Sequence, residues 1–308
     1  MTGTLITTYM KNLAATDRNI SIFANNNTAF ANNVTIANNA TIGGNTAITG
    51  TLAVTGNTTH TGLTTFTGDI VPATSYMRNR IINGSMAIDQ RFSGSANNAT
   101  TSNSYVLDRW AFAAGGAVSG TLTAQRVSTS TTGSPYAIRL ARTSGTYTNS
   151  LVINQVIETI NCYDLAGQNV TLSFKARKGS AYTAGLVASV ITGTGSDQGV
   201  NGATSGSWTG YAVAGSTTIS NATLSTSFQT FSVTCAIGSS VQEICVNLNT
   251  GAFSGTGGAN DYIDITDVQL EVGSVATPFE RRQYGQELML CQRYFEKSYD
   301  DGVAPGTA

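Results

Sequence analysis

Five side chains able to hold a sugar occur within one polar stretch, residues 192–211. The stretch is rich in Gly, Ser and Thr, and it contains one carboxylate, two amides and two aromatic rings: Asp197, Gln198, Asn201, Trp208 and Tyr211. An exposed ring can stack on the apolar face of a pyranose, and nearby amides and carboxylates can bond its hydroxyls. We therefore predict these five as candidate carbohydrate-binding residues. In the alternative interpretation, Trp208 and Tyr211 only anchor a long loop.

The other reactive groups indicate no catalytic centre, metal site or cofactor. The chain has a single histidine, His60, which lies far along the sequence from the predicted sandwich, so a Ser/His/Asp or Cys/His arrangement is not expected. A paired-carboxylate glycosidase is the remaining enzymatic alternative, and its available acids are Asp197, Glu243, Asp261 and Glu271. A calcium site could be drawn from Asp261, Asp264 and Asp267, but hard cations prefer loops, and Asp264 falls inside a predicted strand. We predict a protein that is not an enzyme.

The four cysteines show neither metal-ligand nor disulfide-scaffold spacing: Cys162, Cys235, Cys245 and Cys291. Cys235 and Cys245 could face one another across a hairpin. The favoured interpretation is that they are buried free thiols in strands.

The five candidate carbohydrate-binding residues belong to a long all-β region, about 77 to 280. In this region short strands alternate with Gly, Ser, Asn and Thr loops. In Val170, Leu172, Phe174 and Ala176 every second residue is apolar, which is typical of one buried face. The predicted strands are 136–141, 151–157, 170–176, 185–191, 228–236, 243–248 and 262–271. A region of this size can form one β-sandwich. The spacing of Leu288, Cys291, Tyr294 and Phe295 predicts a short closing helix.

Residues 30–68 carry a different pattern, one apolar residue or histidine at every sixth position. The series is Phe30, Ile36, Ile42, Ile48, Val54, His60 and Phe66, and glycines follow two places after the last five. A period of six is a multiple of the strand period, so each hexad predicts one strand and one bend. One buried side chain per hexad is too little for a free chain, so the hexads must share a core.

Two arrangements would supply that core. Three identical chains wrapped around a threefold axis would place the seven series residues on the axis and pair every strand edge, and we favour this trimeric β-helical shaft. The alternative is a single-chain left-handed β-helix of two to three coils. In the trimer, three copies of His60 would converge on the axis, where they could hold a metal ion or an anion. A neutral histidine bonded to Thr hydroxyls or water explains the same residue without an ion, and we favour it.

Composition excludes several partners. With 16 basic and 17 acidic side chains, the chain is nearly neutral and only 11% charged, so no basic surface for nucleic acid is expected. No run of 18 apolar residues occurs, and the N-terminus lacks the pattern of an export signal, so membrane insertion is not expected. We predict four segments: a docking segment 1–29, the shaft 30–72, the sandwich with its closing helix 77–297, and a flexible tail or linker 298–308.

Several motifs of the sandwich region resemble a domain common in bacteriophage tail fibres. They are NRIINGSM at 79–86, QR at 90–91, DRW at 108–110, LSFKA at 172–176, VQLEVGSVATPFERR at 268–282 and CQRYFEK at 291–297. The resemblance covers about residues 77–297, and it implies a jelly-roll sandwich similar to carbohydrate-binding modules, set in a trimeric virion fibre. We interpret Asp108-Arg109-Trp110 as packing residues, and Arg281 and Arg282 as a charged seam between sandwich and helix.

Together these observations predict a structural and adhesive fibre subunit of the virion, assembled in the host cytoplasm. Its N-terminal segment would dock on a tail or baseplate protein, and three sandwiches would present weak sites for a host-surface glycan. Two alternatives stay open: a spacer that carries a separate receptor-binding domain, and a polysaccharide depolymerase.

Overall fold

The computed structural model describes residue 61, residues 78–131 and residues 133–298. The chain divides into two units, Met1–Gly68 and Asp69–Ala308. All of the described residues except residue 61 belong to the second unit. Three predicted parts lie outside the described residues: the docking segment 1–29, the shaft 30–72 with all of its axis residues but without residue 61, and residues 299–308 of the tail.

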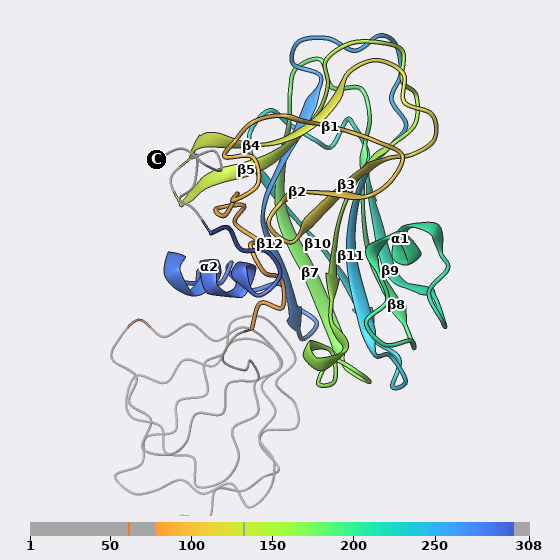
Figure 1. Ribbon diagram of the computed structural model, residues 1–308, viewed down its shortest axis with the longest axis vertical. Coiled ribbons are helices and arrows are strands. Elements are labelled where there is room, and N and C mark those ends of the chain that lie inside the picture. The colour runs from red at the N-terminus through yellow and green to blue at the C-terminus, as the bar shows by residue number, and fades with distance from the viewer. Residues whose placement is uncertain (1–60, 62–77, 132, 299–308) are drawn as a thin grey trace, which may run out of the picture. The chain divides into compact units, whose positions relative to one another are not determined.

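Two antiparallel sheets of six strands form a β-sandwich (Figure 1). The first sheet has the order β1-β4-β5-β12-β7-β10, and the second has the order β2-β3-β6-β11-β8-β9. The strands of the first sheet are β1 (Asn97–Asn98), β4 (Leu122–Thr131), β5 (Ser134–Arg142), β12 (Tyr262–Val272), β7 (Asn169–Lys178) and β10 (Gln229–Ala236). Those of the second are β2 (Ser104–Leu107), β3 (Trp110–Ala114), β6 (Leu151–Ile157), β11 (Glu243–Thr250), β8 (Leu186–Gly193) and β9 (Ala212–Ile219).

The predicted all-β sandwich is confirmed, and all seven predicted strands occur. Residues 151–157 coincide with β6, and 262–271 lie within β12. The alternation in β7 points as predicted, since Val170, Leu172, Phe174 and Ala176 are all buried. The sequence pattern missed β1 to β4 and β9. In β9 only Ile219 is buried, and small or polar residues such as Gly215, Ser216 and Thr218 occupy most other positions, so the alternation in hydrophobicity is too weak to be recognised.

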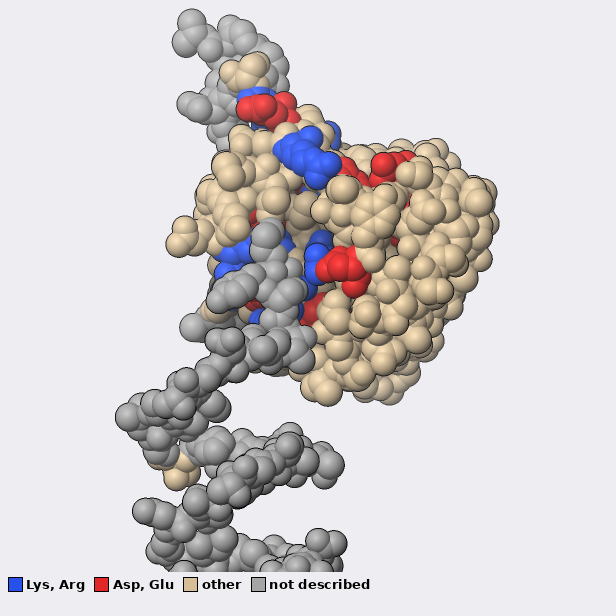
Figure 2. Space-filling view, turned by 90° about the horizontal axis from the view of Figure 1, so that it is seen from below, with Lys and Arg blue, Asp and Glu red and all other residues tan. Residues whose placement is uncertain are grey.

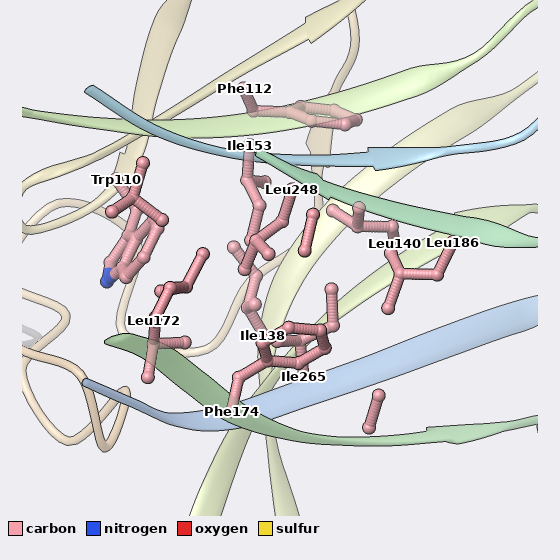
Figure 3. Packing of buried hydrophobic residues seen from close by; sticks show 14 of the residues in the cluster. Trp110, Phe112, Ile138, Leu140, Ile153, Leu172, Phe174, Leu186, Leu248 and Ile265 are labelled. Carbon is pink, nitrogen blue, oxygen red and sulfur yellow. The ribbon is translucent and has the colours of Figure 1, made fainter. Parts of the chain in front are cut away.

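One hydrophobic core fills the space between the sheets (Figure 3). Trp110 and Phe112 reach into it from β3, opposite Leu172 and Phe174 from β7. The Trp110 indole is fully buried and its Nε1 donates to the carbonyl of Asn83 at 3.0 Å. This bond satisfies the ring's only polar group.

The other two residues of the DRW motif also serve packing. Asp108 accepts from the backbone N–H of Gln90 at 2.7 Å and from its Nε2 at 2.6 Å, while Arg109 donates to the carbonyl of Val156. The predicted structural role of this motif is therefore confirmed.

The closing helix α2 (Tyr284–Gln292) exists, but its buried stripe differs from the predicted one. Its buried residues are Glu287 and Cys291, whereas Tyr294 and Phe295 lie beyond the helix. Those two rings are covered by cations instead: Arg109 lies 3.6 Å from the centroid of Tyr294, and Arg91 lies 3.7 Å from that of Phe295.

Glu287 is buried because it accepts from the backbone of Asn83 and pairs with Arg282 at 3.3 Å, which confirms the predicted charged seam for Arg282. Arg281 pairs instead with Asp267 of β12 at 3.4 Å. Among the residues that the structure describes, no helix has the length and apolar content to cross a membrane.

All four cysteines are buried and free. Cys235 lies on β10 and Cys245 on β11, which belong to opposite sheets, so the alternative of a pair across a hairpin is wrong. The prediction that these two are buried free thiols in strands is therefore confirmed. Cys162 follows the 3-10 helix η2 (Thr159–Asn161), and Cys291 lies in α2. Burial raises the pKa of the Cys162 thiol to about 12.

Candidate functional site

The polar stretch singled out by the sequence folds onto the outer face of the second sheet. It connects β8 to β9 and contains the short helix α1 (Val200–Ser205), which ends at Gly206 in the left-handed conformation, φ 74°. Trp208 is only 3% exposed and packs with Ile191, Ala203 and Cys245. Its Nε1 donates to the carbonyl of Gly199 at 3.0 Å. The indole therefore anchors the insertion, and its faces are not open to a sugar.

The four other predicted residues do not form one surface with it. Gln198 accepts from the Thr209 N–H at 2.8 Å, and Asp197 accepts from the Thr159 N–H at 2.9 Å, so both hold the insertion in place. Tyr211 is 37% exposed. Asn201 alone of the five lines a groove.

That groove has a volume of about 500 Å³ and lies between α1, the loop 101–103 and the outer face of β3, β6 and β11. Among the described residues that line it, none is charged and none is aromatic. Its floor carries Ala113, Val152, Asn247 and Asn249, which alternate with residues that face the core. The groove is thus a neutral surface of amides, hydroxyls and small apolar groups.

A chain of asparagine amides crosses the floor of the groove. Asn247 Nδ2 donates to Asn154 Oδ1 at 2.7 Å, Asn154 Nδ2 donates to Asn103 Oδ1 at 3.2 Å, and Asn103 Nδ2 donates to Asn201 Oδ1 at 3.0 Å. Asn154 and Asn247 are direct cross-strand neighbours, which places their side chains on the same face. Because each amide orients the next, the groove presents fixed donors and acceptors.

One polar atom near the groove, the side-chain oxygen of Asn249, lacks a hydrogen-bond partner among the described residues. This atom, Oδ1, is buried. A buried acceptor left unpaired costs free energy, and a donor that reached this oxygen from the groove would remove that cost. A sugar hydroxyl is such a donor.

The acids considered for catalysis all lie elsewhere. Glu243 is buried under the insertion, where its Oε2 accepts from the Gln198 N–H at 2.7 Å. Burial raises the pKa of Glu243, and the nearby Asp197 carboxylate raises it further, while the Gln198 bond opposes both. Glu271 contacts Arg78 at 3.5 Å and Thr277. Neither these acids nor Asp261 line the groove.

Each of the three aspartates of the calcium alternative forms an ion pair with one or two basic side chains. Asp261 pairs with Arg142 at 2.8 Å, and burial raises the pKa of Asp261 while the guanidinium opposes this. Asp264 pairs with Arg139 and Arg177, and Asp267 pairs with Lys175 and Arg281. Within the described ranges, no group of three or more acidic, His or Cys side chains could hold a metal ion.

Comparison with known proteins adds information on the fold only. No family model matches the chain, and no curated protein matches it. Among solved structures, it is similar to the enzymatically active domain of tailspike protein 4 of bacteriophage CBA120, with 18% identity and a TM-score of 0.38 over 63% of this chain and 21% of that one. It is also similar to a putative sugar binding protein from Bacteroides thetaiotaomicron, with 14% identity and a TM-score of 0.41 over 64% of this chain and 100% of that one.

A third similar structure is one of a carbohydrate-binding module, CBM4, with 17% identity and a TM-score of 0.35 over 62% of this chain and 98% of that one. All three TM-scores lie below 0.5, so these likenesses assign this chain neither a family nor a ligand.

Proposed function

We propose that this chain is a non-enzymatic, adhesive subunit of a phage tail fibre, and that its sandwich domain binds a host-surface glycan in the amide-lined groove. The observation that carries the proposal is the fixed row of amides with the unpaired Asn249 Oδ1 beside it. Neutral amides can bond sugar hydroxyls from both donor and acceptor sides. The volume of about 500 Å³ falls in the range of small-ligand sites.

The remaining parts of the fibre follow from the sequence pattern. Hexads over 30–68 favour a homotrimeric shaft, and the segment before them would dock on a tail or baseplate protein in the virion. Three sandwiches on one shaft would bind a glycan-coated surface together. Weak single sites would then be sufficient because linked binding events multiply.

A specific observation favours the spacer alternative. No aromatic ring stands among the described residues of the groove lining, so the stacking that usually supplies much of the affinity for sugars is missing. In this alternative the sandwich only extends the fibre towards a separate receptor-binding domain.

The test is binding of the full chain to purified host surface polysaccharide, measured by affinity electrophoresis. We expect the wild-type chain to be retarded, and Asn249→Ala combined with Asn201→Ala to weaken binding about thirtyfold through loss of two hydrogen bonds worth about 1 kcal/mol each. The matched control is Asn98→Ala, an exposed asparagine on β1 of the other sheet, which should bind like wild type.

Each alternative has its own result in the same experiment. A spacer would show no retardation of any variant across polysaccharides from susceptible hosts. A depolymerase would release oligosaccharide with new reducing ends, so the digested polysaccharide is assayed alongside.

A further inference from the structure

One end of the sandwich, here named the entry end, gathers segments that are far apart in the sequence. It consists of residues 78–82, the β6–β7 loop 158–168, the connection 273–283 between β12 and α2, and α2 itself. Arg78 donates to the carbonyl of Pro278 at 3.1 Å, and Arg80 pairs with Asp164. Figure 1 shows this end at the bottom of the sandwich, with α2 beside it.

The entry end carries the most exposed large apolar side chains of the described residues. They are Ile160, Tyr163, Val275, Tyr284 and Met289, and each is between 62% and 75% exposed. At the opposite end, Val118 in the β3–β4 loop is 41% exposed. A single exposed apolar residue is ordinary, but a group of this kind marks a contact surface.

The entry end also has a pocket of about 280 Å³, against α2. Ile82, Leu290 and Tyr294 line it together with three arginines. Each guanidinium already has a carboxylate: Arg80 pairs with Asp164, Arg282 with Glu287 and Arg293 with Glu158.

The pocket is therefore charge-compensated, and an anion or a nucleic acid would gain little there. In the view from below, blue and red side chains lie next to one another on one side of the domain (Figure 2). Apolar residues beside paired charges are typical of a contact between proteins.

We propose that the entry end is covered by a second copy of this chain, so that the sandwiches touch one another where they leave the shaft. The inference rests on the proposed trimeric fibre. Six residues lead from 72, the predicted end of the shaft, to Arg78, and they can span no more than about 20 Å. Three sandwiches tethered so closely meet first with their entry ends, and the high effective concentration lets a small surface suffice.

The experiment uses full-length chains that carry one introduced cysteine. The four natural cysteines are all buried, so they leave the introduced thiol as the reactive one. Tyr163→Cys and Met289→Cys test the entry end, and Val118→Cys is the matched control at the opposite end. For each we would measure the solution mass by light scattering, the rate of maleimide labelling, and cross-linking between chains by a short bis-maleimide.

We expect trimers throughout, labelling at positions 163 and 289 at least tenfold slower than at position 118, and cross-links between chains at the entry end only. A trimer that labels equally fast at all three positions would overturn this inference and leave the fibre proposal standing. A monomer would overturn both. Slow labelling without any cross-link between chains would assign the surface to a segment of the same chain, which also overturns the inference.

Discussion

The outer faces of the two sheets satisfy their polar groups in opposite ways. On the first sheet the carboxylate of Asp264 lies between Arg139 and Arg177, whose Nε atoms are 2.7 and 2.9 Å away, so the charges satisfy one another. On the second sheet, neutral amides such as Asn154 and Asn247 form a row that ends in an open groove. The charged groups of the first face use one another as partners, whereas the amides of the second face leave donors and acceptors for a ligand.

The largest predicted effect on stability is that of Asp264→Ala, on the first sheet. Asp264 is fully buried, so its removal leaves two guanidiniums close together without a carboxylate. We expect a loss of about 3 kcal/mol in the free energy of unfolding, measured by urea denaturation. The control is Asp164→Ala, whose side chain is 57% exposed in its pair with Arg80, and which should cost less than about 1 kcal/mol. Equal costs would contradict the view that the first face depends on buried compensation.

The next effect is expected from Trp208→Ala on the second sheet. The indole fills a small apolar cluster, so its removal should cost up to about 3 kcal/mol and loosen residues 194–211. Hydrogen exchange of the amides in the insertion is the measurement. Tyr211→Ala, at a half-exposed ring in the same insertion, should change stability by less than about 0.5 kcal/mol. If exchange in the insertion stays at the wild-type rate in Trp208→Ala, the anchor role is wrong.

A smaller effect should follow from breaking the amide row. Asn247→Ala removes the donor to Asn154 Oδ1, which should cost about 1 kcal/mol because the acceptor stays buried. Asn169→Ala, at an exposed position at the start of β7, is the control and should be neutral in the same thermal unfolding measurement. Identical melting of both variants would show that the row adds no stability.

The smallest effect concerns the buried Glu243 and depends on pH. Its pKa is raised in the folded protein, so the ionised form is disfavoured, and the stability linked to its proton is present at low pH and lost as the pH rises through the folded pKa. Glu243→Gln should therefore melt above wild type at pH 7, with the difference shrinking to nothing below about pH 4, where the acid is protonated in both states. A difference that is constant with pH would contradict this.

The fold was predictable where hydrophobicity alternates strongly. In β7 every second residue is a large apolar one, and the strand lies where the pattern predicts it. The helix stripe was not predictable, because Glu287 is buried by contacts with Asn83 and Arg282, which come from other parts of the chain. Tyr294 and Phe295 lie beyond the end of the helix, where the guanidinium groups of Arg109 and Arg91 cover their rings.

The candidate site was predicted only in part, since a sugar platform was expected on the insertion itself. An aromatic ring in a polar loop suggests an exposed platform, but the cost of leaving Trp208 in water is avoided by packing it on the sheet. Of the groove residues only Asn201 was named. A usable signal was present in β6 and β11, where asparagines occupy outward positions of otherwise apolar strands: Asn154, Asn247 and Asn249.

The uncharged lining of the groove has a consequence for the conditions under which it would work. The described lining residues offer no charge, so dissolved ions have nothing there to screen and protons have nothing to titrate. A neutral glycan held by these amides would therefore bind with the same affinity at low and at high salt concentration.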